Sequence, residues 1–177
     1  MTIAESRAAV LAEAASFLGT PFHLNASLKG VGVDCARFLI ACYEAGGIHL
    51  DLDIGHAGRD WFMHADDDRF ISRVRAHGRE IQHPEPGDMA LFKIGHSWAH
   101  AAIIVDYPRA IHAKWNAGVQ WTDLTWKDLR SLPVLFFSPW PEITVSGTEG
   151  SVQSAHGDGG SPSPADDSAI CAEQAQS

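Results

Sequence analysis

Three residues of this chain carry side chains that together can catalyse acyl transfer: Cys35, His100 and His112. Cys35 follows a glycine-containing loop and opens an apolar segment that is typical of a helix, residues 36–45. A thiol in the first turn of a helix meets the partial positive charge of unpaired backbone N–H groups, and this field favours the nucleophilic thiolate. The sequence therefore predicts a lowered pKa for the Cys35 thiol and a nucleophilic role for its sulfur.

Both histidines lie in segments that are typical of β-strands, His100 in residues 99–106 and His112 in residues 110–115. A general base must reach the nucleophile within hydrogen-bond distance, and the small residues beside His100 leave room for a cleft. A polar group on the neighbouring strand can bond the far nitrogen of that base and fix its tautomer. We therefore expect His100 to act as the base and His112 to orient it. Chance pairing is the alternative, because the chain has 10 histidines.

Each of these side chains also has a purely structural interpretation. Free cysteines are among the most deeply buried residues of proteins, and Cys42 fits this pattern because it shares a helical face with Phe38 and Leu39. For Cys35, the position in a first turn after a glycine-containing loop favours a chemical role instead. For His100, a buried core histidine is the alternative.

A zinc site assembled from Asp88, His96, His100 and His112 is a further alternative. Two residues four apart on a strand point along one face but lie about 13 Å apart, which is too far for one ion. The spacing of His96 and His100 therefore disfavours a metal, and we expect no cofactor.

The elements that must position these side chains follow from capping and periodicity. Thr2 and Glu5 form a T-x-x-E capping box that predicts a helix over residues 3–18, and Asp34 predicts the N-cap of a second helix over residues 35–45. Residues 48–80 indicate one or two short helices. Runs rich in Val, Ile, Phe and Trp predict strands at residues 89–94, 99–106, 110–115, 118–122 and 134–138. Helices followed by an antiparallel sheet predict an α+β domain.

The 177-residue chain has a formal charge of -9, and residues 143–177 hold five acidic residues but no Lys or Arg. This Gly-, Ser- and Pro-rich segment predicts a disordered acidic tail after a single domain over residues 1–142. The acidic balance argues against a nucleic-acid binder. Three cysteines are too few for a disulfide framework. The N-terminus has no basic, continuously apolar segment, so we expect cytoplasmic synthesis without a signal peptide, and no membrane partner.

In order, the chain contains Gly19-Thr20-Pro21-Phe22, Asp34-Cys35, Pro86-Gly87-Asp88, His100 and Ile111-His112-Ala113. This ordered set resembles the NlpC family of cell-wall cysteine peptidases, a compact branch of the papain-like clan. It is most similar to the versions found in phage tails and gene-transfer particles, which share the Gly-Thr-Pro-aromatic opening and lack signal peptides. The resemblance covers about residues 5–140.

The resemblance implies a papain-like fold and hydrolysis of peptidoglycan stem peptides beside D-glutamate and diaminopimelate, without a metal. It implies Cys35 as the nucleophile, His100 as the base and His112 as the orienting residue. Asp88 would fix the turn before the first strand of the sheet. The partners it implies are peptidoglycan peptides and, in a virion or tail particle, phage-tail proteins.

Four further residues are implied at the substrate site: Phe22, Asp34, Ala36 and Arg37. Asp34 is expected to be structural as well. The family usually continues Asp-Cys with Ser-Gly, where this chain has Ala36 and Arg37, and Phe22 stands where the family often has a tyrosine. These differences bear on substrate preference and activity, so two alternatives stay open. One is a catalytically inactive module that binds wall fragments or serves in a phage tail, and the other is a thiol amidase or acyltransferase acting on another amide.

Overall fold

The structure is a computed structural model that describes residues 1–52 and 69–142. The acidic tail predicted for residues 143–177 lies outside the described residues, and so do residues 53–68 of the segment for which short helices are predicted. Within the described part, no helix is long and apolar enough to cross a membrane.

Two N-terminal helices form where capping residues predict them. Helix α1 spans Ile3–Ser16 and begins with the complete capping box of Thr2 and Glu5. Helix α2 spans Cys35–Ala45, and the Asp34 side chain caps it by accepting from the backbone N–H of Arg37. Helix α1 ends two residues before the predicted end at residue 18. The chain forms a turn after Ser16, and Gly19 adopts a left-handed φ of 83°. A third helix, α4, spans Arg69–His77.

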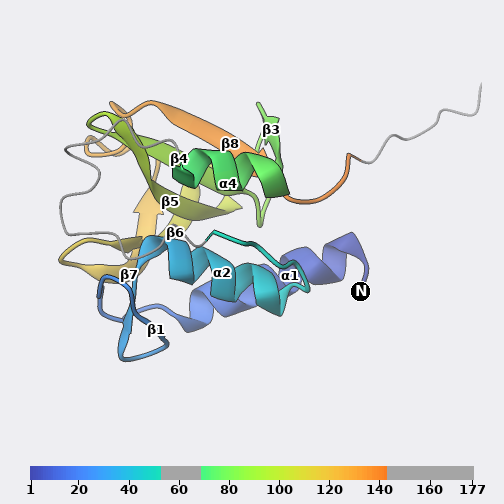
Figure 1. The fold of residues 1–177 in the computed structure, drawn as a ribbon, viewed down its shortest axis with the longest axis horizontal. Coiled ribbons are helices and arrows are strands. Elements are labelled where there is room, and N and C mark those ends of the chain that lie inside the picture. Colours follow the sequence, from blue (N-terminus) through green and yellow to red (C-terminus); the bar gives the residue numbers. More distant parts are fainter. Residues whose placement is uncertain (53–68, 143–177) are drawn as a thin grey trace, which may run out of the picture. The chain divides into compact units, whose positions relative to one another are not determined.

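Six strands form one antiparallel sheet in the order β3-β8-β4-β5-β6-β7 (Figure 1). Their bounds are β3 Arg79–Ile81, β4 Met89–Ile94, β5 Ser97–Asp106, β6 Arg109–Lys114, β7 Gly118–Asp123 and β8 Val134–Ser138. The α+β class and all five predicted strands are confirmed. Three further strands were not predicted: β3, and the two strands of a hairpin in the loop before α2, β1 Ser27–Leu28 and β2 Gly32–Val33. These strands are two or three residues long, too short for an alternating pattern to develop.

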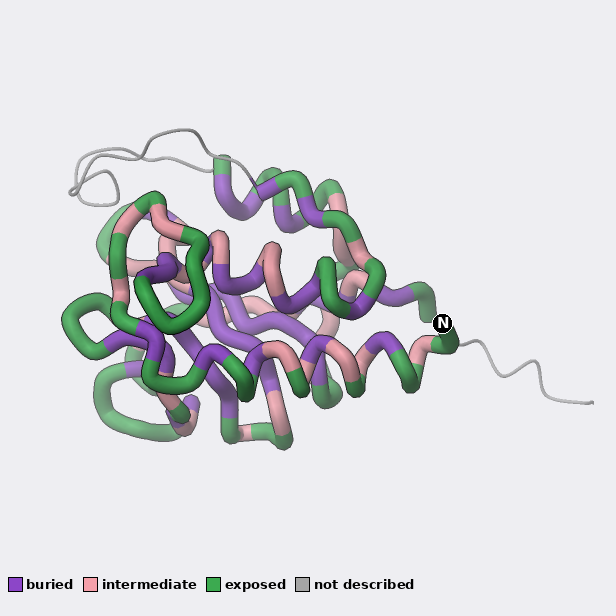
Figure 2. The backbone as a smooth tube through the Cα atoms, turned by 90° about the horizontal axis from the view of Figure 1, so that it is seen from below, coloured by how far each residue is buried: buried purple, intermediate pink, exposed green. Residues whose placement is uncertain are grey.

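The two faces of the sheet bury different clusters of side chains. The helices cover one face, where Phe38, Leu39 and Cys42 of α2 pack with Ile103 and Ile111 of the sheet. The other face buries a smaller apolar cluster. Strand residues of this cluster include Phe92, Ala102, Ile104 and Ala110, and Leu124 and Leu129 join them from the segment after β7. Figure 2 shows that the central strands are mostly buried and the connecting loops mostly exposed. Cys42 is a core residue, as its helical position predicts.

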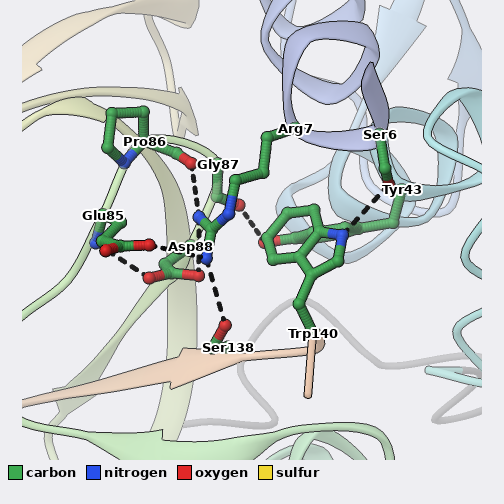
Figure 3. A network of polar contacts seen from close by, with 9 residues as sticks. All are labelled: Ser6, Arg7, Tyr43, Glu85, Pro86, Gly87, Asp88, Ser138 and Trp140. Carbon is green, nitrogen blue, oxygen red and sulfur yellow. Dashed lines mark hydrogen bonds and ion pairs between the residues drawn. The ribbon is translucent and has the colours of Figure 1, made fainter. Parts of the chain in front are cut away.

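Arg7 of α1 ties the N-terminal helix to the turn that precedes β4 (Figure 3). Its guanidinium lies 3.1 Å from Asp88 Oδ1 and 3.2 Å from Glu85 Oε2, and stacks 4.1 Å from the ring centre of Trp140. Asp88 is buried, and its Oδ2 accepts from the backbone N–H of Glu85 at 2.8 Å. Among the described residues its Oδ1 accepts no well-directed hydrogen bond. The ion pair with Arg7 therefore offsets the cost of removing this charged oxygen from water. Asp88 thus fixes this turn, as expected.

Two buried aromatic residues complete the same junction (Figure 3). The Tyr43 hydroxyl donates to the carbonyl oxygen of Gly87 at 2.6 Å, and the indole Nε1–H of Trp140 donates to Ser6 Oγ at 3.0 Å. Each bond satisfies a polar group that burial would otherwise leave unpaired. Helices α1 and α2 are therefore held against the Pro86-Gly87-Asp88 turn and the end of β8.

The loop after α1 is joined to the edge strand β7 at one point of very close approach. Gly19 N–H donates to Val119 O at 2.9 Å, and Val119 N–H donates to Thr20 O at 2.8 Å. A Cβ on Gly118 would lie 2.5 Å from the carbonyl oxygen of Thr20, and Gly118 also has a left-handed φ of 79°. Only glycine fits this position without moving the backbone.

We expect Gly118→Ala to destabilise the fold more than Gly30→Ala. Gly30 has nearly the same φ, 76°, but a Cβ there would meet nothing within 4 Å. Gly30→Ala should therefore cost only the left-handed strain of about 1 to 2 kcal/mol, and Gly118→Ala roughly twice that or more. Urea unfolding followed by circular dichroism measures both. Equal losses would show that the loop does not approach β7 as closely as described.

Candidate active site

Cys35 is the first residue of α2, and Asp34 holds the backbone on both sides of it. Asp34 Oδ1 accepts from the backbone N–H of Arg37 at 2.9 Å, and Oδ2 accepts from that of Asn25 at 2.8 Å. The N–H of Phe38 is bonded to the backbone oxygen of Asp34 at 2.9 Å. The cap therefore uses the N–H groups of the third and fourth helical residues and leaves those of Cys35 and Ala36 near the sulfur.

The sulfur of Cys35 lies against the backbone of β5 where β6 no longer pairs with it. The ladder between β5 and β6 ends at the pair Ala102 and His112. Beyond that pair, the Cys35 thiol donates to the carbonyl oxygen of Ala99 at 3.7 Å, and the backbone N–H of Ala101 also bonds the sulfur. Ala99 and Ala101 flank His100 in the sequence. The nucleophile candidate is thus placed beside the strand segment that carries the base candidate.

A register shift in β5 occurs at the same place. Phe92 of β4 pairs with His100, but the next residue, Lys93, pairs with Trp98, so that Ala99 has no partner of its own on β4. An extra residue of this kind is a β-bulge, which changes the direction of the neighbouring side chains and is common near active sites. The bulge places His100 on the same side as Phe92, with ring centroids 5.8 Å apart.

The two histidines are in direct contact. His100 Nε2 lies 2.9 Å from His112 Nδ1, and the ring centroids are 5.0 Å apart at an angle of 65°. His112 is buried, with 1% of its surface exposed, whereas His100 is half-buried. His112 Nε2 has no hydrogen-bond partner among the described residues. The structure therefore joins the rings of His100 and His112, and it places the Cys35 sulfur on the backbone of the residues on either side of His100.

The expected lowering of the Cys35 pKa is wrong for this structure. Burial, and after it the negative charge of Asp34, raises the pKa of the thiol to about 12. The backbone N–H groups of Ala101, Ala36 and Cys35 favour the thiolate but are outweighed. Among the described residues, Cys35 is half-buried rather than fully enclosed. The resting sulfur is a neutral thiol.

Both histidines are held neutral as well. The pKa of His100 is lowered mainly by burial, and further by the neighbouring His112 and by Lys114. Burial also lowers the pKa of His112, and Lys114 adds to this effect while Asp128 opposes it. Lys114 and Asp128 form an ion pair at 2.6 Å, so the two charges partly cancel. The resting site thus contains a neutral thiol and two neutral imidazoles rather than an ion pair.

The four residues implied at the substrate site lie in different surroundings. Asp34 and Ala36 are buried, Asp34 with its oxygens bonded as described and Ala36 within the core. Arg37 turns back onto the cap, with its Nη1 2.7 Å from Asp34 Oδ2. Phe22 forms a bridge with Val33 and packs its ring 5.2 Å from that of an aromatic residue at the end of β6, Trp115.

Two features of this site were not predicted. Trp115 was placed in the predicted strand of residues 110–115, whereas it follows β6 and packs on Phe22; a tryptophan beside the segment of His112 was the available signal. The bulge at Ala99 leaves no comparable signal. Among the described residues, no three His, Cys, Asp or Glu side chains gather as metal ligands would.

Solved structures with the same fold include several with low sequence identity. A lipoprotein-like protein of the NLP/P60 family from Staphylococcus aureus shares 19% identity at a TM-score of 0.53, with 75% of this chain and 41% of that protein covered. The NlpC/p60 domain of the peptidoglycan hydrolase SagA shares 20% identity at a TM-score of 0.52, with 73% of this chain and 96% of that domain covered. The peptidoglycan hydrolase RipB of Mycobacterium tuberculosis shares 16% identity at a TM-score of 0.53, with 80% of this chain and 70% of that protein covered. At these identities the likeness shows the fold, a papain-like α+β domain.

This chain thus spans about two fifths of the Staphylococcus protein, and almost all of the SagA domain, in the matched region. Comparison with curated protein sequences gave no match. The sequence model of the NlpC/P60 family matches residues 19–131, which include Cys35, His100 and His112. Because this match extends over more than half of the chain, the chain belongs to the NlpC/P60 family.

Proposed function

We propose that this chain is a cysteine peptidase that hydrolyses peptidoglycan stem peptides with Cys35, His100 and His112. The observation that carries the proposal is the placement of the Cys35 sulfur on the β5 backbone on either side of His100, with His100 Nε2 2.9 Å from His112 Nδ1. The matched family and the peptidoglycan hydrolases of similar fold support the substrate class. The amide beside D-glutamate and diaminopimelate and a setting in a phage tail stay predictions from the sequence.

The tautomer of the histidine pair follows from the role of each nitrogen. For His100 to accept a proton from Cys35, its Nδ1 must be unprotonated, because its Nε2 is engaged with His112. His100 Nε2–H then donates to His112 Nδ1, and His112 carries its own proton on Nε2. His112 is therefore a positioning residue that keeps the basic nitrogen of His100 available.

The reaction starts from neutral groups. As the Cys35 sulfur forms a bond to the amide carbonyl carbon, its proton passes to His100 Nδ1, and the developing oxyanion accepts from the backbone N–H of Cys35. His100 then returns the proton to the leaving nitrogen as the C–N bond breaks. A water molecule gives a proton to His100 and its hydroxyl to the acyl carbon, which releases the acid and restores the thiol.

A non-catalytic module that binds wall fragments is the second candidate. The raised pKa of Cys35 favours it, because a thiol that resists ionisation is a weak nucleophile without an effective base. Arg37 also keeps a guanidinium, paired with Asp34, in the first turn of α2, and a guanidinium is a group that binds anionic peptides. A module of this kind would bind muropeptides without cleaving them.

We expect Cys35→Ala to abolish the release of soluble muropeptides from purified peptidoglycan while the fold is retained. The matched control is Cys42→Ala, which removes the buried thiol two turns further along α2 and should leave turnover within a few-fold of wild type. Chromatography of the digests measures both. Equal release by wild type and Cys35→Ala would rule out this nucleophile. Binding without release by wild type would establish the second candidate.

We expect His112→Leu to lower kcat by roughly 10² to 10⁴ with little change in KM, because His100 loses the partner that fixes its tautomer. His112→Asn should keep much more of kcat, since its side-chain oxygen can still accept from His100 Nε2–H. Steady-state kinetics on a soluble stem peptide separates the two constants. Equal losses in both variants would mean that His112 serves packing alone.

The free energy of unfolding should fall as the pH drops below about 6.5, the ordinary pKa of histidine. Because burial lowers the pKa of His100 and His112 in the folded state, the unfolded chain binds more protons in this range, and stability decreases. Each histidine contributes a slope of up to about 1.4 kcal/mol per pH unit. Urea titrations between pH 4 and pH 8 measure this free energy in wild type and in the double variant His100→Gln/His112→Gln. The free energy of unfolding should depend less steeply on pH in the double variant. An unchanged slope would place the acid sensitivity elsewhere.

A further inference from the structure

A cavity of about 350 Å³ is lined by none of the catalytic candidates and lies at the start of strand β6 and the end of strand β7. Five residues line it: Arg109, Trp121, Thr122, Asp123 and Trp126. Its volume falls within the range of small-ligand sites, about 300 to 1,000 Å³, which combine aromatic walls with a few polar groups. No role for these residues follows from the proposed peptidase.

The register of β6 and β7 places Arg109, Trp121 and Asp123 of this cavity on the face of the sheet opposite to His112, and Thr122, which alternates with them, on the face of His112. Arg109 pairs with Asp123, and Ile111 pairs with Trp121. Side chains alternate along a strand, so Trp121 and Asp123 share the face of Ile111, and His112 faces the other way. β7 is an edge strand, and the loop at Thr20 covers it only as far as Val119. Among residues 1–52 and 69–142, no backbone hydrogen bond from outside the sheet reaches the part of this edge that carries Trp121.

The two tryptophans are unusually exposed for large apolar side chains. Trp121 has 45% of its surface exposed and Trp126 has 54%. Trp126 is held beside the end of β7, because its backbone N–H donates to Asp123 O at 3.0 Å. Exposed aromatic side chains that gather around a cavity, with polar groups between them, indicate a binding site.

The polar groups of the cavity favour a neutral ligand that is rich in hydroxyl groups. Arg109 and Asp123 carry opposite charges, and Arg109 is further paired with the exposed Asp106 at 3.0 Å. Asp123 Oδ1 accepts from the backbone and hydroxyl of Thr125, which fixes the carboxylate. A free anion would meet the carboxylate of Asp123 in the cavity, and the guanidinium of Arg109 is already paired with Asp106. A sugar ring can instead place its apolar C–H face on an indole and its hydroxyls on the fixed charged groups.

We propose that this cavity binds a sugar ring of a glycan strand, with Trp121 and Trp126 as the stacking surfaces. The proposal rests on the proposed function for its choice of glycan, since stem peptides are attached to glycan strands in peptidoglycan. Binding a sugar on β7 would raise the effective concentration of the attached peptide near the catalytic candidates, of which His112 lies on the neighbouring strand β6. The sugar site would therefore speed the cleavage of polymeric peptidoglycan and would leave the cleavage of free stem peptide unchanged.

The test uses the full chain and a peptide-free probe, the tetrasaccharide of N-acetylglucosamine, with tryptophan fluorescence and calorimetry as readouts. Trp121→Ala and Trp126→Ala should each weaken binding by at least about tenfold, as expected for a central tryptophan contact. Tyr107→Ala is the control: its side chain is 54% exposed, like that of Trp126, but does not line the cavity. It should bind as wild type does. Thermal unfolding checks that each variant is folded.

The outcomes separate this proposal from the peptidase. Binding by Cys35→Ala equal to wild type, together with slower release from intact peptidoglycan but unchanged cleavage of free stem peptide in Trp126→Ala, would support it. If wild type binds the sugar but cleaves nothing, the site stands and the peptidase fails. If wild type cleaves free peptide but does not bind the sugar, the glycan site is overturned. Self-association that Trp121→Ala abolishes, without sugar binding, would identify a contact between copies instead and also overturn it.

Discussion

The contact between the first residue of α2 and the unpaired part of β5 sets the geometry of the whole site. β5 continues past the end of its ladder with β6, and the Cys35 sulfur lies on the backbone that is left there, between Ala99 and Ala101. Helix α2 can reach this point because Asp34 caps it and because Tyr43, Arg7 and Asp88 hold its other end and its neighbour α1 to the sheet. Loss of any of these contacts would move the sulfur relative to His100.

The same contact explains why the electrostatics differ from the simple expectation for a helix N-terminus. Backbone N–H groups favour the thiolate, but partial burial of the sulfur and the negative charge of Asp34, the residue that caps the helix, favour the thiol. Capping and activation therefore oppose each other at this position. Burial also lowers the pKa of both histidines, so the pair stays neutral. In the proposed mechanism, proton transfer from Cys35 therefore accompanies attack on the substrate, and His112 fixes the position of the free lone pair of His100.

Much of the fold was predictable from local signals, and the site was predictable in part. The capping box at Thr2, the cap at Asp34 and the runs of β-branched residues predict α1, α2 and five strands because these signals act within a few residues. Strand order, the bulge at Ala99 and the burial of Cys35 depend on contacts between distant segments, so no local pattern contains them. The pairing of His100 with His112 lies between these cases, since their residue types suggested it and the register of β5 and β6 had to supply it.

The most direct measurement is covalent labelling with a stem peptide in which an electrophilic vinyl sulfone replaces the scissile amide. Recognition of the peptide, a reactive Cys35 and a competent His100 are all needed for rapid labelling. Intact mass and peptide mapping should find one adduct, on Cys35, which forms about a hundredfold more slowly in His100→Gln. Labelling at another residue, no labelling at all, or labelling of Cys35 at equal rates in the two proteins would contradict the account.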